Sequence, residues 1–175
     1  MTGTNDLLYA AAAGGSTTPT LQTTVGTLNV TTNTTAFIYG AQRGQFNSAT
    51  LTGSGNIIYQ PNYVRDRLTF GNASAFTGTI TFEQHQNTSG GGIGYDGPLG
   101  FPNAPVIFGI TNASFPTFYG STTVGNGVVF PMGSLAGGDN TAELAGSSQN
   151  VGANVIYSIG GLNTSTTYGL SLIHI

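Results

Sequence analysis

The sequence predicts an all-β domain built as a stack of parallel strands, and three observations lead to this fold. Polarity comes from Thr, Ser, Asn and Gly rather than from charge, since 5% of the 175 residues are charged and 38% are hydrophobic. Thr and the aromatic residues favour strands. Runs of alternating polarity recur between turn signals, whereas apolar residues do not recur at helical spacing. A short phrase also repeats along the chain, which is typical of stacked structural units.

The strand-like runs follow one another in order along the chain. In the first, residues 20–32, the positions Leu21, Thr23, Val25, Leu28 and Val30 alternate with other residues. Further runs follow at residues 34–40, 44–53, 55–60, 67–72, 78–84, 104–110, 127–135, 141–146 and 154–162. Glycine interrupts every candidate helix except the alanine-rich segment at residues 7–13, for which a short helix or a strand are both open.

One region departs from this pattern. Residues 87–120 are dense in Gly and Pro, and we expect a long loop that leaves the regular scaffold. The chain is long enough for one domain with a real core, so residues 1–169 are expected to form a single β-helical domain with this excursion.

The repeated phrase has the pattern apolar–Gly–small–Leu–small. It reads VGTLNVT at residues 25–31, MGSLAGG at 132–138 and IGGLNTS at 159–165. In a parallel β-solenoid each coil pairs with the next at a strand spacing of about 4.8 Å, and only the inward side chains are apolar. Glycine and small residues suit tight corners of such a coil. An antiparallel β-sandwich or jelly roll is the alternative fold.

Residues 127–169 resemble secreted bacterial proteins that carry autotransporter-associated β-strand repeats. The likeness rests on the phrase YSIGGLNTSTTYG in this region, and residues 68–83, LTFGNASAFTGTITFE, look like a degenerate copy of the same repeat. The resemblance implies a right-handed single-stranded parallel β-helix, secretion or display at the cell surface, and a passenger role in which these coils stack on neighbouring coils of a longer chain.

Composition excludes several classes of partner and site. A formal net charge of −3 with only three arginines argues against nucleic acid, because few groups could contact phosphates. The absence of cysteine excludes disulfides and thiolate metal sites. No signal peptide is recognisable at the start, and no segment is long enough to span a membrane. We expect no cofactor and no metal.

Few residues could carry chemistry. Arg65, Asp66 and Arg67 form a charge cluster, Glu83 and His85 are expected on the next coil, and Asp96 follows. Pectin-cleaving β-helices hold Ca²⁺ with carboxylates and use an arginine as base, so these residues are the candidates if the protein acts on polysaccharides. A calcium site needs several converging carboxylates, however, and the other acids are scattered. We therefore expect a solvated surface ion pair instead.

Aromatic residues could provide a carbohydrate-stacking platform. Tyr95, Phe101 and Tyr119 are the candidates, with a role as core or corner fillers as the alternative. Residues 170–175, LSLIHI, differ from everything before them and resemble the translation of a sequencing-library adapter. We expect this tail to be non-native and the domain to be truncated.

These observations favour a non-catalytic, adhesin-like passenger segment of a secreted or cell-surface bacterial protein. Its expected partners are a host surface or an extracellular polysaccharide. The alternative is a polysaccharide-active β-helix enzyme, either a lyase or a hydrolase, or a carbohydrate-binding module.

Overall fold

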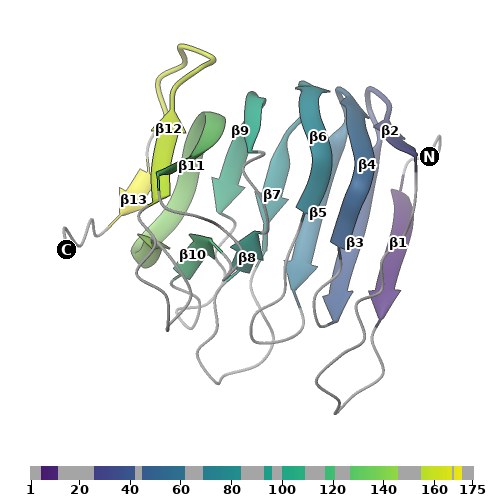
Figure 1. The fold of residues 1–175 in the computed structure, drawn as a ribbon, viewed down its shortest axis with the longest axis horizontal. Helices are drawn as coiled ribbons and strands as arrows, with labels where there is room; N and C mark the ends of the chain where they lie inside the picture. Colours follow the sequence, from purple (N-terminus) through teal and green to yellow (C-terminus); the bar gives the residue numbers. More distant parts are fainter. Residues whose placement is uncertain are drawn as a thin grey trace.

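The chain forms rows of parallel strands that lie side by side from the N-terminus to the C-terminus (Figure 1). The computed structural model describes residues 5–11, 26–41, 45–61, 69–83, 93–95, 100–108, 117–120, 127–145, 155–166 and 168–170. The strands are β1 (Asn5–Ala11), β2 (Thr27–Val30), β3 (Thr35–Ala41), β4 (Gln45–Gly53), β5 (Asn56–Pro61), β6 (Thr69–Phe76), β7 (Ile80–Phe82), β8 (Ile93–Tyr95), β9 (Phe101–Phe108), β10 (Thr117–Gly120), β11 (Val128–Ala145), β12 (Val155–Ile159) and β13 (Tyr168–Leu170).

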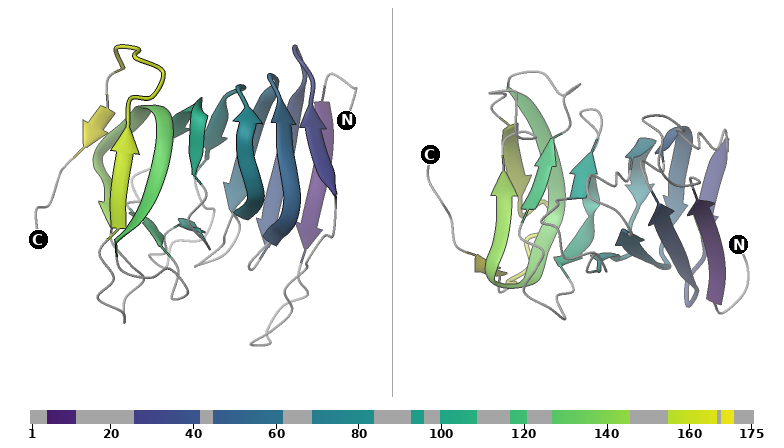
Figure 2. Two further views of the ribbon diagram at one scale, coloured as in Figure 1. Left: turned by 45° about the horizontal axis from the view of Figure 1, so that its top comes forward. Right: turned by 90° about the horizontal axis from the view of Figure 1, so that it is seen from below.

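Two sheets are built from alternate strands of the chain. The first runs in the order β1-β3-β5-β7-β9-β11, and the second in the order β2-β4-β6. The long β11 also pairs with β12 and β13, and through its C-terminal half with β10, which in turn pairs with β8. Figure 2 shows the two sheets facing each other, so the chain passes from one sheet to the other and back again.

Every strand pair recorded among the described residues is parallel. The number of residues between paired positions on adjacent strands varies. It is smaller between Thr35 and Asn56 than between Phe101 and Met132. An antiparallel sandwich or jelly roll, the alternative fold, would pair its strands in the opposite sense. The structure is therefore all-β with parallel pairing throughout its described part.

The core lies between the two sheets because the inward positions of the strands are apolar. In β9 the burial alternates along the strand, with Phe101, Ala104, Val106 and Phe108 buried. β2 follows the same rule through Leu28 and Val30. Such alternation is typical of strands with one face on a core. The largest fully buried side chains are Tyr59, Phe76, Phe130, Ile38, Leu51, Ile57, Ile80, Met132 and Val30.

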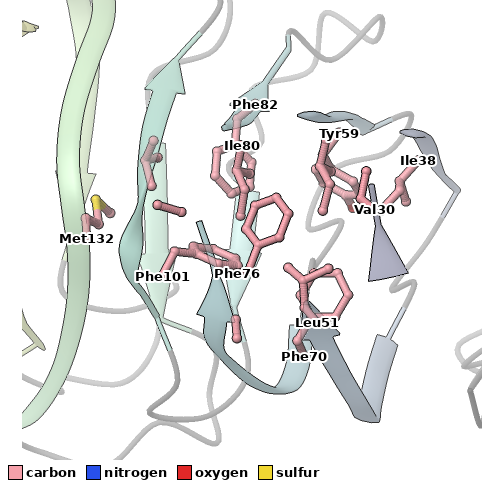
Figure 3. Close-up of a cluster of buried hydrophobic side chains, with 14 of the residues drawn as sticks. Val30, Ile38, Leu51, Tyr59, Phe70, Phe76, Ile80, Phe82, Phe101 and Met132 are labelled. Carbon is pink, nitrogen blue, oxygen red and sulfur yellow. The ribbon is translucent and has the colours of Figure 1, made fainter. Parts of the chain in front are cut away.

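An aromatic column crosses this core from strand to strand. The ring centroids of Tyr59 and Phe82 lie 6.1 Å apart, those of Phe82 and Phe101 6.4 Å, and those of Phe101 and Phe130 6.0 Å. Tyr157 follows at 6.2 Å from Phe130. These spacings fall in the range preferred by aromatic pairs, which contribute about 0.5–1.5 kcal/mol beyond area burial. Figure 3 shows Tyr59, Phe82 and Phe101 in this column and Phe76 beside them.

The last two copies of the repeated phrase lie on top of each other. Met132 and Ile159, the first residues of these two copies, are in register on β11 and β12. The Gly160 N–H donates to the Met132 carbonyl at 3.2 Å, and the Leu162 N–H donates to the Gly133 carbonyl at 2.8 Å. The phrase therefore marks equivalent positions of two stacked chain segments.

One expectation needs correction. Asn5–Ala11 forms strand β1, paired with β3, so the helical option for residues 7–13 is wrong over its described part. Within residues 87–120, where we expect a loop excursion, the structure describes β8, β9 and β10, and β9 is a full member of the first sheet that covers most of the run at 104–110. Its alternating burial explains this, since Phe101 and Phe108 anchor the strand in the core despite the surrounding Gly and Pro.

Within the described ranges, the structure contains no helix with the length and hydropathy needed to cross a membrane.

Candidate functional surface

A corner of the molecule, where the chain passes from the second sheet back to the first, is lined by uncharged hydrogen-bonding side chains. We call Asn29, Thr32, Thr52, Ser54 and Thr77 the polar corner. The Thr52 hydroxyl donates to Asn29 Oδ1 at 3.2 Å, and the hydroxyls of Thr32 and Ser54 lie 2.6 Å apart. The Thr77 hydroxyl donates to the Gly53 carbonyl at 3.4 Å. The polar corner thus runs across three consecutive segments of chain.

Backbone hydrogen bonds stack the three turns on one another. The Gly55 N–H donates to the Val30 carbonyl at 2.9 Å, and the Thr77 N–H donates to the Gly53 carbonyl at 2.9 Å. Close approach is possible because the corner is built from glycine. A Cβ on Gly55 would collide with the Thr31 carbonyl, and one on Gly78 would collide with the Gly55 carbonyl. The turns of the corner are therefore closely packed, and its polar side chains recur on successive turns.

A second polar contact ties the two sheets together. Asn72 Oδ1 accepts from both the backbone N–H and the hydroxyl of Ser74, at 2.9 and 2.8 Å. The Asn103 amide on β9 then donates to the Ser74 carbonyl at 2.8 Å. All three side chains are exposed. The polar corner therefore continues toward β9 as a surface of amides and hydroxyls.

The outer face of the first sheet carries a row of apolar side chains interrupted by one threonine. The row takes one residue from each of five neighbouring strands, which are in register with one another in the order Phe37, Ile58, Thr81, Ile107 and Ala136. Phe37 is 37% exposed, and the other four are partly exposed. We call these five residues the outer row. Beside it, exposed Asn56 aligns with partly exposed Thr35.

Most of the charged candidates lie outside the described residues. This holds for Asp66, Arg67, His85 and Asp96, so their mutual distances are not established. Glu83 directly follows β7, and its backbone N–H donates to the Tyr59 carbonyl at 2.8 Å, while the residue is partly exposed. The described part of the chain contains no group of three or more His, Asp or Glu residues that could hold a metal ion.

The aromatic candidates separate into two kinds of position. Phe101 is a core residue with 3% of its surface exposed, enclosed by Phe70, Phe82 and Phe130, so its ring does not reach solvent and offers no face to a sugar. Tyr119 on β10 aligns with Gly94 of β8, and Tyr95 aligns with Gly120. These two tyrosines are thus on neighbouring strands, one register position apart.

Comparisons with known proteins give no relative for this chain. It matches no known protein family, no curated protein and no solved structure. Function is therefore inferred from the geometry of the surface.

The polar corner was not among the candidates drawn from the sequence. Its signal is a second repetition, TLNV at residues 27–30 and TLTG at 50–53, which the structure aligns in register from Thr27 with Thr50 to Val30 with Gly53. Chemically, the polar corner and the outer row offer hydroxyls, amides and a small apolar strip without a charged side chain among them. Such a surface suits neutral hydrogen-bonding ligands rather than ions.

Proposed function

We propose that the chain is a non-catalytic, adhesin-like structural segment of a secreted or cell-surface bacterial protein, folded as a right-handed parallel β-helix. Support for the fold comes from the parallel pairing and from the repeated return of the chain to a neighbouring position. Parallel strands joined by such crossovers are right-handed in nearly all known cases, which favours this hand. The segment's structural partners would be neighbouring coils of a full-length chain.

The observation that carries the functional proposal is the uncharged polar corner together with the outer row. A surface with recurring hydroxyls and amides can contact a glycan or host surface at many weak points, and repeated weak contacts give avidity. No cofactor or metal is needed for such contacts. Nucleic acid remains a poor partner, because the whole chain has only three Lys and Arg residues and a formal net charge of −3.

A cysteine-pair experiment tests the fold. The chain contains no cysteine, so introduced pairs report without background. Thr35 and Asn56 are in register on adjacent strands, and Cα atoms of such neighbours lie within the roughly 4.4–6.8 Å span of a disulfide. The double variant Thr35→Cys/Asn56→Cys should form an intramolecular bond under mild oxidation. The control Thr35→Cys/Ile58→Cys, displaced along β5, should stay reduced, and equal oxidation of both pairs would count against parallel pairing in this register.

An adhesion experiment tests the function. Non-adherent bacteria that display the chain should bind immobilised extracellular polysaccharide or host-cell layers, and no reducing sugar should be released. Replacing three polar-corner residues together, Asn29→Ala, Thr52→Ala and Ser54→Ala, should reduce adherence while the melting temperature stays close to the parent value. Release of reducing sugar by the purified chain would contradict the non-catalytic proposal and support the enzyme alternative.

Binding of a neutral, insoluble polysaccharide by the outer row is a second candidate, since this row places Phe37 beside Ile58, close to Asn56 and Thr35. An aromatic and aliphatic strip next to amide and hydroxyl groups is the combination that sugar rings require, with stacking on one side and hydrogen bonds on the other. Co-sedimentation with insoluble cellulose or chitin checks this candidate. Phe37→Ala should lower the bound fraction, whereas Val129→Ala, an exposed apolar position elsewhere, should leave it unchanged.

A further inference from the structure

The second sheet is interrupted between β6 and β9. Its ladder runs from β2 through β4 to β6 and stops there, whereas the first sheet continues at the same level of the stack, where Ile80 pairs with Val106. Among the described residues no backbone ladder joins β6 to β9, although Phe70 and Phe101, both labelled in Figure 3, meet edge to face with ring centroids 6.4 Å apart. We call this boundary between β6 and β9 the seam.

Ser74 shows why the ladder stops on the β6 side of the seam. The N–H and C=O of one residue in a strand point toward the same neighbouring strand. The Ser74 N–H donates to Asn72 Oδ1 at 2.9 Å, and the Ser74 carbonyl accepts from the Asn103 side chain at 2.8 Å. Side chains therefore take both positions that a neighbouring backbone would fill. Because the bond from Asn103 spans the seam directly, no further strand lies between β6 and β9 at this point.

The β9 side of the seam is irregular as well. In its pairing with β11, β9 places three residues, 102–104, opposite Gly133 alone, so the strand bulges there. Pro102 has no N–H, and proline within sheets is confined to edges, strand starts and bulges. A bulge re-aims the side chains that it carries, and here it directs the Asn103 amide to Ser74.

The two sheets are thus held differently at the same level of the stack. Backbone hydrogen bonds join β7 to β9 along Ile80–Phe82 in the first sheet. In the second sheet the polar link across the seam is the bond between Asn103 and Ser74, both of which are exposed. An exposed hydrogen bond is readily exchanged for bonds to water. Local opening takes place where few protected backbone bonds must break, so the seam is the weaker of the two connections.

We propose that the seam is a hinge: the second sheet opens between β6 and β9 while the first sheet stays paired. The segments before and after the seam then move as two bodies about the β7–β9 ladder. The polar corner lies entirely before the seam, so its own geometry is kept while its direction relative to β11 and β12 changes. The hinge does not require the surface to be adhesive.

Thiol labelling under native conditions tests the hinge, since the chain contains no cysteine. Ala73→Cys and Ala104→Cys each place one buried thiol beside the seam, on β6 and on β9, at positions 1% and 0% exposed. Ala36→Cys is the control, because Ala36 is 1% exposed and is paired on both sides in the first sheet. Both seam thiols should react at least about tenfold faster than the control thiol.

Urea separates local opening from global unfolding. Urea well below the unfolding midpoint should accelerate labelling of the control steeply and labelling of the seam thiols slightly, because local opening exposes less surface. In the absence of urea, adding Asn103→Ala should accelerate labelling of both seam thiols by the same factor, roughly twofold to fivefold, since it removes the bond across the seam.

Seam thiols that react no faster than the control, or that share its steep dependence on urea, would overturn the proposal. Acceleration by Asn103→Ala at Ala73→Cys alone would also overturn it, because that result indicates fraying of β6 rather than separation of two edges. If one of the seam variants does not fold, the labelling rate and the urea dependence of the other decide between a hinge and a closed sheet.

Discussion

Phe101 and Phe130 meet edge to face in the core, with ring centroids 6.0 Å apart and ring planes inclined by 77°. Both rings are buried, and Phe101 contacts Phe70 and Phe82 as well. Phe101→Ala should therefore lower the free energy of unfolding by about 3–5 kcal/mol. Phe37→Ala, at a position 37% exposed, should cost less than about 1 kcal/mol. Urea unfolding followed by circular dichroism measures both, and equal losses would place Phe101 outside the core.

The glycine at position 78 should tolerate no side chain. A Cβ there would collide with the Gly55 carbonyl and lie 2.7 Å from Phe76 Cζ, and a backbone carbonyl cannot move aside without disturbing the corner. Gly78→Ala should cost at least about 2 kcal/mol, which lowers the melting temperature by roughly 4–8 °C. Gly26→Ala is the matched control, since nothing lies within 4 Å of its Cβ position. An unchanged melting temperature for Gly78→Ala would show that the corner is looser than described.

Asn33 adopts a left-handed backbone conformation with φ of 63° in the turn between β2 and β3. Asparagine and glycine accept this region, whereas a β-branched residue is strained there. Asn33→Val should destabilise the protein by about 1–2 kcal/mol, while Asn33→Gly should stay within about 0.5 kcal/mol of the parent. Thermal melts of the two variants decide the matter, and the reverse order of stability would refute this account of the turn.

The stability of the protein should depend on the hydrogen-bond donor that residue 103 presents to Ser74. The Asn103 amide donates to the Ser74 carbonyl at 2.8 Å, and Asn103→Ala should cost about 0.5–1 kcal/mol because the bond is exposed. Asn103→Asp places a carboxylate against a carbonyl oxygen, so its pKa should be raised in the folded state. The loss of stability should then be largest at neutral pH and should diminish as pH falls below about 4, where the carboxyl is protonated.

The free energies of unfolding of the parent chain, Asn103→Ala and Asn103→Asp, measured at neutral pH and at a pH below about 4, test this pH dependence. The parent chain and Asn103→Ala serve as controls for other groups that titrate over the same interval. If Asn103→Ala were as stable as the parent, the hydrogen bond would contribute nothing. If Asn103→Asp were no less stable than Asn103→Ala at neutral pH, the carboxylate would not lie against the Ser74 carbonyl.

The local features of the fold could be predicted from the sequence, because each strand carries its own signal. Alternation along residues 104–110 and 127–135 predicts strands that the structure places at β9 and β11. The repeated phrase that begins at Met132 and again at Ile159 predicts that these two residues are equivalent, and they are in register. These signals depend only on which side chains face a core and on which positions need glycine.

The order of side chains on the surface could not be predicted in the same way. The chain takes a shorter path from Thr35 to its partner Asn56 than from Ile80 to its partner Val106, so no single period aligns the rows. A register error of one residue would move each side chain to the opposite face. The polar corner and the outer row therefore emerge only from the observed pairing, and the candidate Phe101 belongs to the core.

The lengths of the connections also depend on the direction in which the chain crosses between the two sheets. Turns from the second sheet back to the first are short, at positions 31–34, 54–55 and 77–79, and hydrogen bonds with stacked glycines fix them. The connections from the first sheet to the second vary in length, at positions 12–26 from β1 to β2, 42–44 from β3 to β4 and 62–68 from β5 to β6. Insertions and deletions should therefore accumulate during evolution on one side of the molecule and be purged from the other. A foreign epitope spliced between Pro61 and Thr69 should be carried without loss of folding, whereas the same peptide between Gly53 and Asn56 should abolish it.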